Sequence, residues 1–185
     1  MNKIISLDSI SIQMELGDHS YGGAIIRRWT TTDTVKVGKF CSFASNIRIV
    51  LDGNHHTDRF STFPFRERLN WTECSPGNWG KSTPVIGNDV WMADDVVIYS
   101  GCNIGDGAVI AGQSVVTKNV PPYAIVAGNP GRIVKYRFDS ETIRELLEYK
   151  WWDLPLDTIR SKLIPHADDI QAVLKELREI RQRNR

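Results

Sequence analysis

The chain has 185 residues, 41% of them hydrophobic, and a formal net charge of +1. This length and composition suit one soluble domain with a substantial core, and the small charge gives no reason to expect a nucleic-acid partner. The sequence has no apolar run of about 18 residues and no signal-peptide pattern at its start, so we expect no membrane partner and a cytoplasmic location. The three cysteines then fit reduced thiols.

A six-residue period is the strongest pattern in the chain. It begins with Val37, Phe43 and Ile49 and returns from Ile86 to Pro121. Six consecutive hexads open with Ile86, Met92, Ile98, Ile104, Ile110 and Val116. Four positions later stand Val90, Val96, Cys102, Ala108, Ser114 and Val120. A period of six fits neither a helix nor a plain alternation of two, and it is typical of a solenoid with about 18 residues to a coil.

This reading predicts where the side chains of each hexad point. The opening aliphatic side chain faces inward and stacks on its equivalent one coil away, as Ile86 on Ile104 and Ile98 on Val116. The smaller residue four positions later sits at a corner. The Asn, Asp and Gly residues in 87–89 and 105–107 suit turns with positive φ. A β-sandwich is the alternative, but its strand spacing would be irregular.

Two segments break the period. Residues 51–84 have no periodicity and contain two of the four histidines, so we expect a projecting excursion there. After Ala127 the chain leaves the solenoid for a helix capped by Asp139 or Ser140, and a last helix begins near Asp169. We therefore divide the chain into a β-helix domain, residues 1–136, and a helical extension, residues 137–185, packed on the same domain.

Four short motifs accompany the repeat in a fixed order: GNH at 53–55, STFPF at 61–65, AGNP at 127–130 and KWWDLP at 150–155. Together they resemble the xenobiotic acetyltransferases, the group with type B chloramphenicol and streptogramin A acetyltransferases. The resemblance implies a mainly β fold, a left-handed parallel β-helix built from hexapeptide repeats, with a projecting loop and C-terminal α-helices. It also implies a homotrimer with active sites at subunit interfaces and acetyl-CoA as cosubstrate.

Acetyl transfer from a thioester to a hydroxyl needs a base, and histidine is the natural one because its ordinary pKa of about 6.5 lies near working pH. Of the four histidines, His55 matches the family's catalytic residue. The sequence leaves three groups that could orient its ring: Asp52, Asp58 or a backbone carbonyl. His56 has no such match, and Cys74 is not required as a nucleophile.

Residues around the acceptor and the cosubstrate follow from the same resemblance. The expected acceptor contacts are His19, Tyr21, Asn54 and Trp71. The expected cofactor contacts are Ala93, Ala111, Thr117, Lys118, Arg132 and Lys135. The cations would pair with the phosphates of coenzyme A. Each residue has a plainer interpretation as well, because a tryptophan can anchor a loop, an alanine can fill a tight corner and a lysine can be solvated.

Three alternatives remain. The γ-class carbonic anhydrases share this kind of solenoid and bind zinc through three histidines, but here only the neighbours His55 and His56 lie together, so we expect no metal. The acceptor could be an antibiotic, a sugar or a nucleotide-linked sugar of polysaccharide biosynthesis. The chain could also be a non-catalytic scaffold, although a scaffold needs neither the Asn54–His55 pair nor the cations of the exit segment.

Overall fold

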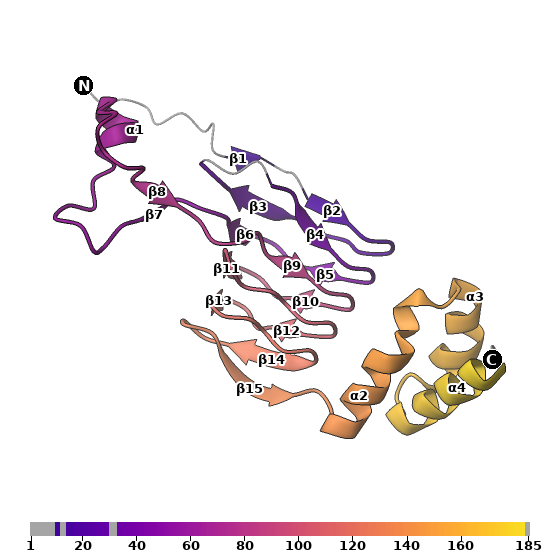
Figure 1. Cartoon of the computed structure of the whole chain (residues 1–185). Helices are drawn as coiled ribbons and strands as arrows, with labels where there is room; N and C mark the ends of the chain where they lie inside the picture. Colours follow the sequence, from indigo (N-terminus) through magenta and orange to yellow (C-terminus); the bar gives the residue numbers. More distant parts are fainter. Residues whose placement is uncertain (1–9, 12–13, 30–32, 184–185) are drawn as a thin grey trace. The chain divides into compact units, whose positions relative to one another are not determined.

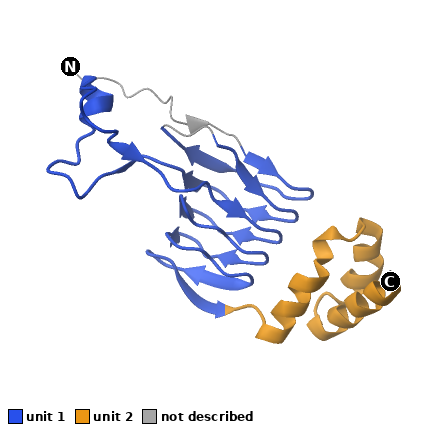
Figure 2. Ribbon diagram, viewed as in Figure 1, with its two compact units in different colours: residues 1–135 blue, residues 136–185 orange. Residues whose placement is uncertain are grey.

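The computed structural model describes residues 10–11, 14–29 and 33–183 and divides into two compact units, Met1–Lys135 and Tyr136–Arg185 (Figure 2). The described strands lie in the first unit, apart from Tyr136 at the end of the last strand, and the second unit contains the long helices. The expectation that the second packs on the first stays a prediction. In the part of the chain that the structure describes, no helix is both long enough and apolar enough to cross a membrane.

The first unit is a stack of coils whose short strands form three sheets (Figure 1). One sheet contains β2 (Met14–Leu16), β4 (Val35–Val37) and β9 (Val85–Ile86). The next contains β5 (Ser42–Phe43), β10 (Trp91–Met92), β12 (Val109–Ile110), β14 (Ala124–Ala127) and β15 (Arg132–Tyr136). The last contains β1 (Ile10–Ser11), β3 (Ala24–Arg27), β6 (Ile47–Val50), β11 (Val97–Tyr99) and β13 (Val115–Val116). Neighbouring coils pair in parallel, so the predicted hexapeptide-repeat β-helix is confirmed.

The register confirms the predicted inward columns. They are Val37–Ile86–Ile104, Phe43–Met92–Ile110 and Ile49–Ile98–Val116. None of these side chains is more than 6% exposed, and the residues four positions after each opener from Val90 to Val120 are buried as well. Burying an aliphatic side chain of this size contributes roughly 1.5–3 kcal/mol, so the columns are the main source of the unit's stability.

The explanation of the turns needs a correction. Positive φ falls at the fourth residue of five of the six hexads: Asp89, Asp95, Gly101, Gly107 and Gln113. Gly87 and Gly105 do not have positive φ, and they are required for a different reason. A Cβ on Gly87 would lie 2.6 Å from Oδ1 of Asp106, so these glycines let adjacent coils approach. Asn88 likewise links coils, because its backbone and side-chain N–H groups both donate to Oδ1 of Asp106.

The excursion leaves the β-helix after β6 and returns at β9, and it projects from the stack in Figure 1. It contains β7 (Asn54–His55), helix α1 (Phe65–Leu69) and β8 (Asn78–Trp79), and β7 and β8 pair antiparallel. Its insertion explains why the Lys39 amide donates to Asn88, 49 residues on, whereas the Asn88 amide donates to Asp106 only 18 residues on.

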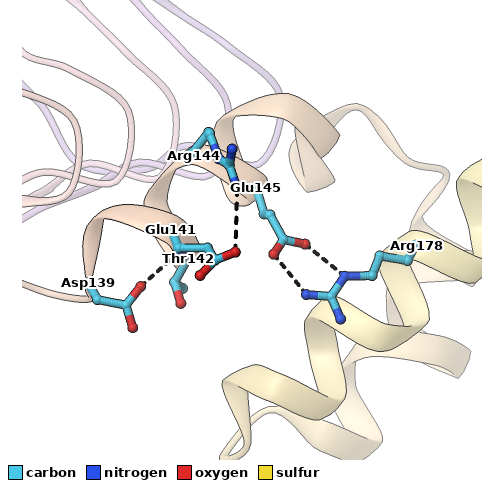
Figure 3. A network of polar contacts seen from close by, with 6 residues as sticks. All are labelled: Asp139, Glu141, Thr142, Arg144, Glu145 and Arg178. Carbon is cyan, nitrogen blue, oxygen red and sulfur yellow. Dashed lines mark hydrogen bonds and ion pairs between the residues drawn. The ribbon is translucent and has the colours of Figure 1, made fainter.

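The second unit consists of helices and tight turns. They are α2 (Ser140–Tyr149), η1 (Trp151–Asp153), α3 (Leu156–Thr158), η2 (Ile159–Leu163), η3 (Ile164–His166) and α4 (Ile170–Arg183). Asp139 caps α2, since its carboxylate accepts the Thr142 N–H at 2.8 Å. Arg178 of α4 donates twice to Glu145 of α2, at 2.7 and 2.8 Å (Figure 3). Arg178 therefore joins α4 to α2 and has a structural role.

Candidate functional site

The imidazole of His55 is oriented by a backbone carbonyl. Its Nδ1 lies 2.6 Å from the carbonyl oxygen of Thr62, in the STFPF segment. A carbonyl can only accept a hydrogen bond, so Nδ1 carries the hydrogen and the neutral ring presents the lone pair of Nε2. Of the three orienting groups that the sequence left open, the structure therefore selects the carbonyl.

The two nearby aspartates have other partners. Oδ1 of Asp52 accepts the backbone N–H of Trp29 at 2.6 Å, and Asp52 is only 3% exposed. Oδ1 of Asp58 lies 3.6 Å from Nδ1 of His56, at the surface. Asp52 thus fixes the chain that carries Trp29, while the partner of the His55 ring is the Thr62 carbonyl.

A pocket of about 300 Å³ opens beside His55. Its lining consists of Trp29, Gly53, His55, Phe63, Pro64, Arg68 and Asn78. It combines one ring base, one cation and one neutral amide with mostly apolar walls, which is the usual composition of a small-molecule site. An acceptor held there by its apolar parts would have its polar groups placed by these three side chains.

Trp29, Arg68 and Asn78 were not predicted as lining residues, because none belongs to the repeat or to a matched motif. Gly53 offered one usable signal, since it directly precedes the Asn54–His55 pair. Its φ is +89°, and a Cβ there would lie 2.5 Å from the Trp29 ring. A glycine before this pair indicates that another side chain packs closely against the backbone there, but the sequence does not show which side chain it is.

The predicted acceptor residues lie outside the lining of this pocket in a single chain. Asn54 turns its amide to the carbonyl of Trp79 at 3.3 Å, and Trp71 stacks on Phe65 with ring centroids 5.3 Å apart. His19 and Tyr21 lie exposed on the first coil, where the His19 ring packs 4.9 Å from the ring of Phe40. A substrate contact by His19, Tyr21, Asn54 or Trp71 stays a prediction.

The predicted cofactor residues fall into separate groups. Ala93 and Ala111 are half-buried on successive coils, directly after β10 and β12. Thr117 and Lys118 are exposed after β13, at the next corner of the coil. Arg132 and Lys135 are exposed on β15. One chain therefore offers two corners and an edge strand, and the contacts of these residues with a cofactor stay predictions.

No group of three or more His, Cys, Asp or Glu side chains is placed to hold a metal ion within the described ranges. Cys41 and Cys102 are free and buried, as expected for structural thiols, and burial raises the pKa of both.

Comparisons with known proteins agree with this architecture. A family model described as bacterial transferase hexapeptide (six repeats) matches residues 83–118. A chloramphenicol acetyltransferase of Agrobacterium fabrum is 40% identical over 136 residues, which are 71% of this chain and 65% of that protein. A probable macrolide acetyltransferase of Lysinibacillus sphaericus is 41% identical over 133 residues, which are 65% of this chain and 70% of that protein.

Among solved structures, a hexapeptide-repeat acetyltransferase of Vibrio cholerae complexed with acetyl coenzyme A is similar with a TM-score of 0.53 and 28% identity. The match covers 69% of this chain and 62% of that one. This chain thus spans just under two thirds of the length of the chloramphenicol acetyltransferase. The identity to the macrolide relative and the buried register of the hexads lead to one conclusion: the chain belongs to the hexapeptide-repeat acetyltransferases.

Proposed function

We propose that the protein is an acetyl-CoA-dependent O-acetyltransferase that transfers acetyl to a hydroxyl of a small molecule, either an antibiotic or a sugar. The observation that carries the proposal is the Nδ1–Thr62 hydrogen bond of His55, which leaves Nε2 as a base beside a pocket of acceptor size. Relatives named as chloramphenicol and macrolide acetyltransferases support the reaction, as does the solved relative complexed with acetyl coenzyme A.

His55 acts as general base in direct transfer. Its Nε2 takes the proton of the acceptor hydroxyl while the oxygen attacks the thioester carbonyl carbon. When the tetrahedral intermediate collapses, the carbon–sulfur bond breaks and His55 returns the proton to the leaving thiolate. The products are an acetyl ester and free coenzyme A. The Thr62 carbonyl keeps the ring in one orientation and stabilises the imidazolium that forms between the two proton transfers.

The cosubstrate site would combine two kinds of surface. Ala93 and Ala111 provide a narrow wall of small side chains on successive coils. Lys118, Arg132 and Lys135 are exposed cations suited to phosphates. Because these groups lie at different corners of one chain, a homotrimer in which a corner of one subunit faces a neighbour would bring them together. A cytoplasmic location fits the buried free thiols and completes the proposal.

The lining of the pocket favours a neutral or anionic acceptor over a cationic one. Arg68 is its one cation, and aromatic side chains form much of the wall. Uncharged antibiotics such as chloramphenicol or streptogramin A suit this lining, and so do neutral or nucleotide-linked sugars. A polycationic acceptor would be repelled by Arg68.

The test is thiol release from acetyl-CoA with chloramphenicol, streptogramin A, methyl galactoside and an amino sugar as acceptors. We expect turnover with at least one of them and a loss of roughly 10²- to 10⁴-fold in kcat for His55→Ala. His166→Ala is the matched control, because His166 is exposed in the second unit, and it should keep full activity. Absence of turnover with every acceptor would favour the scaffold alternative, and an active His55→Ala protein would refute the mechanism.

A further inference from the structure

Asn78 has a buried oxygen that lacks a protein partner. Its Oδ1 is inaccessible to solvent, and no described residue donates a hydrogen bond to it. Most buried polar atoms in proteins have a partner, so an exception needs an explanation. Asn78 also lines the His55 pocket, where it is the only neutral amide among the lining residues.

The pairing of the excursion strands places this amide beside the catalytic ring. In the antiparallel pair of β7 and β8, His55 lies directly opposite Asn78, and Asn54 lies opposite Trp79. Directly opposed residues point to the same face of the pair, with Cβ atoms roughly 5 Å apart. The side chains of His55 and Asn78 therefore share the face that borders the pocket.

Helix α1 holds the backbone of Asn78 in place. Glu67 accepts the N–H of Gly77 at 2.8 Å, and the pKa of Glu67 is lowered mainly by this hydrogen bond, with a smaller contribution from the N–H of Asn78. A Cβ on Gly77 would lie 2.6 Å from Pro64, so the strand and the start of the helix are in close contact. The backbone that carries Asn78 is thus held by α1 on one side and by the pairing with β7 on the other.

We propose that Asn78 recognises the acceptor. Its Oδ1 is buried without a partner among the described residues, and when the acceptor enters the pocket the side-chain amide turns so that Oδ1 accepts a hydrogen bond from a second donor, a hydroxyl or an N–H close to the hydroxyl that His55 deprotonates. The inference rests on the proposed function and narrows it, because it selects diols and N-acylated amino alcohols over simple alcohols. A site that presents a buried acceptor atom discriminates strongly against ligands that leave the atom unpaired.

The test compares acceptors that carry or lack the second donor. Two series are used: chloramphenicol with its 1-deoxy analogue and the analogue whose amide N–H is replaced by an ester oxygen, and methyl galactoside with its monodeoxy derivatives. With the wild type, removal of one particular donor should lower kcat/KM by roughly 10- to 100-fold. With Asn78→Ala, removal of that donor should have little further effect.

Two further variants separate recognition from other roles. Asn78→Asp keeps an acceptor oxygen and should retain the preference for the donor. If Asn78 instead donated its N–H to the oxyanion of the intermediate, Asn78→Asp would lower kcat with every acceptor. Thr72→Ala, an exposed change in the same excursion, should leave the preference unchanged. Unfolding temperatures of all variants show whether the excursion stays folded.

The outcomes distinguish this inference from the proposed function. If the wild type turns over and His55→Ala does not, but Asn78→Ala keeps the wild-type preference, the acceptor role of Asn78 is wrong and the acetyltransferase stands. If Asn78→Ala lowers kcat/KM by the same factor with every acceptor, the acceptor role is also wrong. If the wild type turns over neither these two series nor any other acceptor of the panel, the proposed function itself fails.

Discussion

Replacement of Gly53 by alanine perturbs the pocket at its most crowded point. The new Cβ would lie 2.5 and 2.6 Å from two atoms of the Trp29 ring, whereas carbon atoms in good contact lie about 3.5–4.0 Å apart. The ring must therefore move by about 1 Å. The backbone of Trp29 is fixed through its N–H to the buried Asp52, so the indole itself has to turn. The φ of +89° adds strain of about 1–3 kcal/mol for alanine.

This strain corresponds to a fall in unfolding temperature of roughly 2–12 °C for a protein of this size. A displacement of about 1 Å beside the base can also cost up to about 10²-fold in rate, so kcat/KM for acetyl transfer should fall at least about tenfold. Thermal unfolding at one fixed protein concentration and thiol release measure the two effects. Gly23→Ala is the control, because no atom lies within 4 Å of a Cβ there. If Gly53→Ala matches Gly23→Ala in both assays, the argument from the Trp29 contact is wrong.

Three further predictions concern the core, the thiols and the excursion. Ile98 is fully buried between two coils, so Ile98→Ala should cost about 2–5 kcal/mol in chemical unfolding and Ile98→Val about 0.5–1.5; equal costs would contradict the column packing. Cys74 should react with a thiol reagent in the native protein, whereas Cys41 and Cys102, buried and with raised pKa values, should react only after denaturation; a second fast thiol would refute this. The lowered pKa of Glu67 stabilises the fold above its unfolded value of about 4.3, and this contribution is lost as pH falls through the folded value. Glu67→Gln should therefore unfold at a lower temperature than the wild type at pH 7, and the gap should close in acid; a gap independent of pH would contradict the assignment.

The β-helix could be predicted because each coil repeats the same constraint. One inward position every six residues is enough to set the register, as the column of Ile49, Ile98 and Val116 shows. Turn conformation was harder to predict. Phe40 and Gln113 adopt positive φ although neither residue type favours it, because the stacking of coils fixes the turn whatever residue occupies it.

The site was only partly predictable, because most of its residues lie in the excursion, which has no repeat. A matched motif located His55, but its partners come from a segment without a period. Thr62 lies seven residues on, and Asn78 lies opposite His55 only through the hairpin. Trp29 reaches the pocket from an earlier coil. Tertiary pairing of this kind leaves no spacing rule in the sequence, so the sequence could single out His55 as the proposed base but could not predict the residues around it.

The claim that His55 is the general base is tested most directly by single-turnover kinetics. The enzyme is kept in molar excess over acetyl-CoA, the best acceptor is saturating, and ester formation is followed by rapid quench, so the rate does not depend on product release. The account predicts that His55→Ala lowers this rate by roughly 10²- to 10⁴-fold, while His166→Ala leaves it unchanged. Equal rates for the wild type and His55→Ala would contradict it.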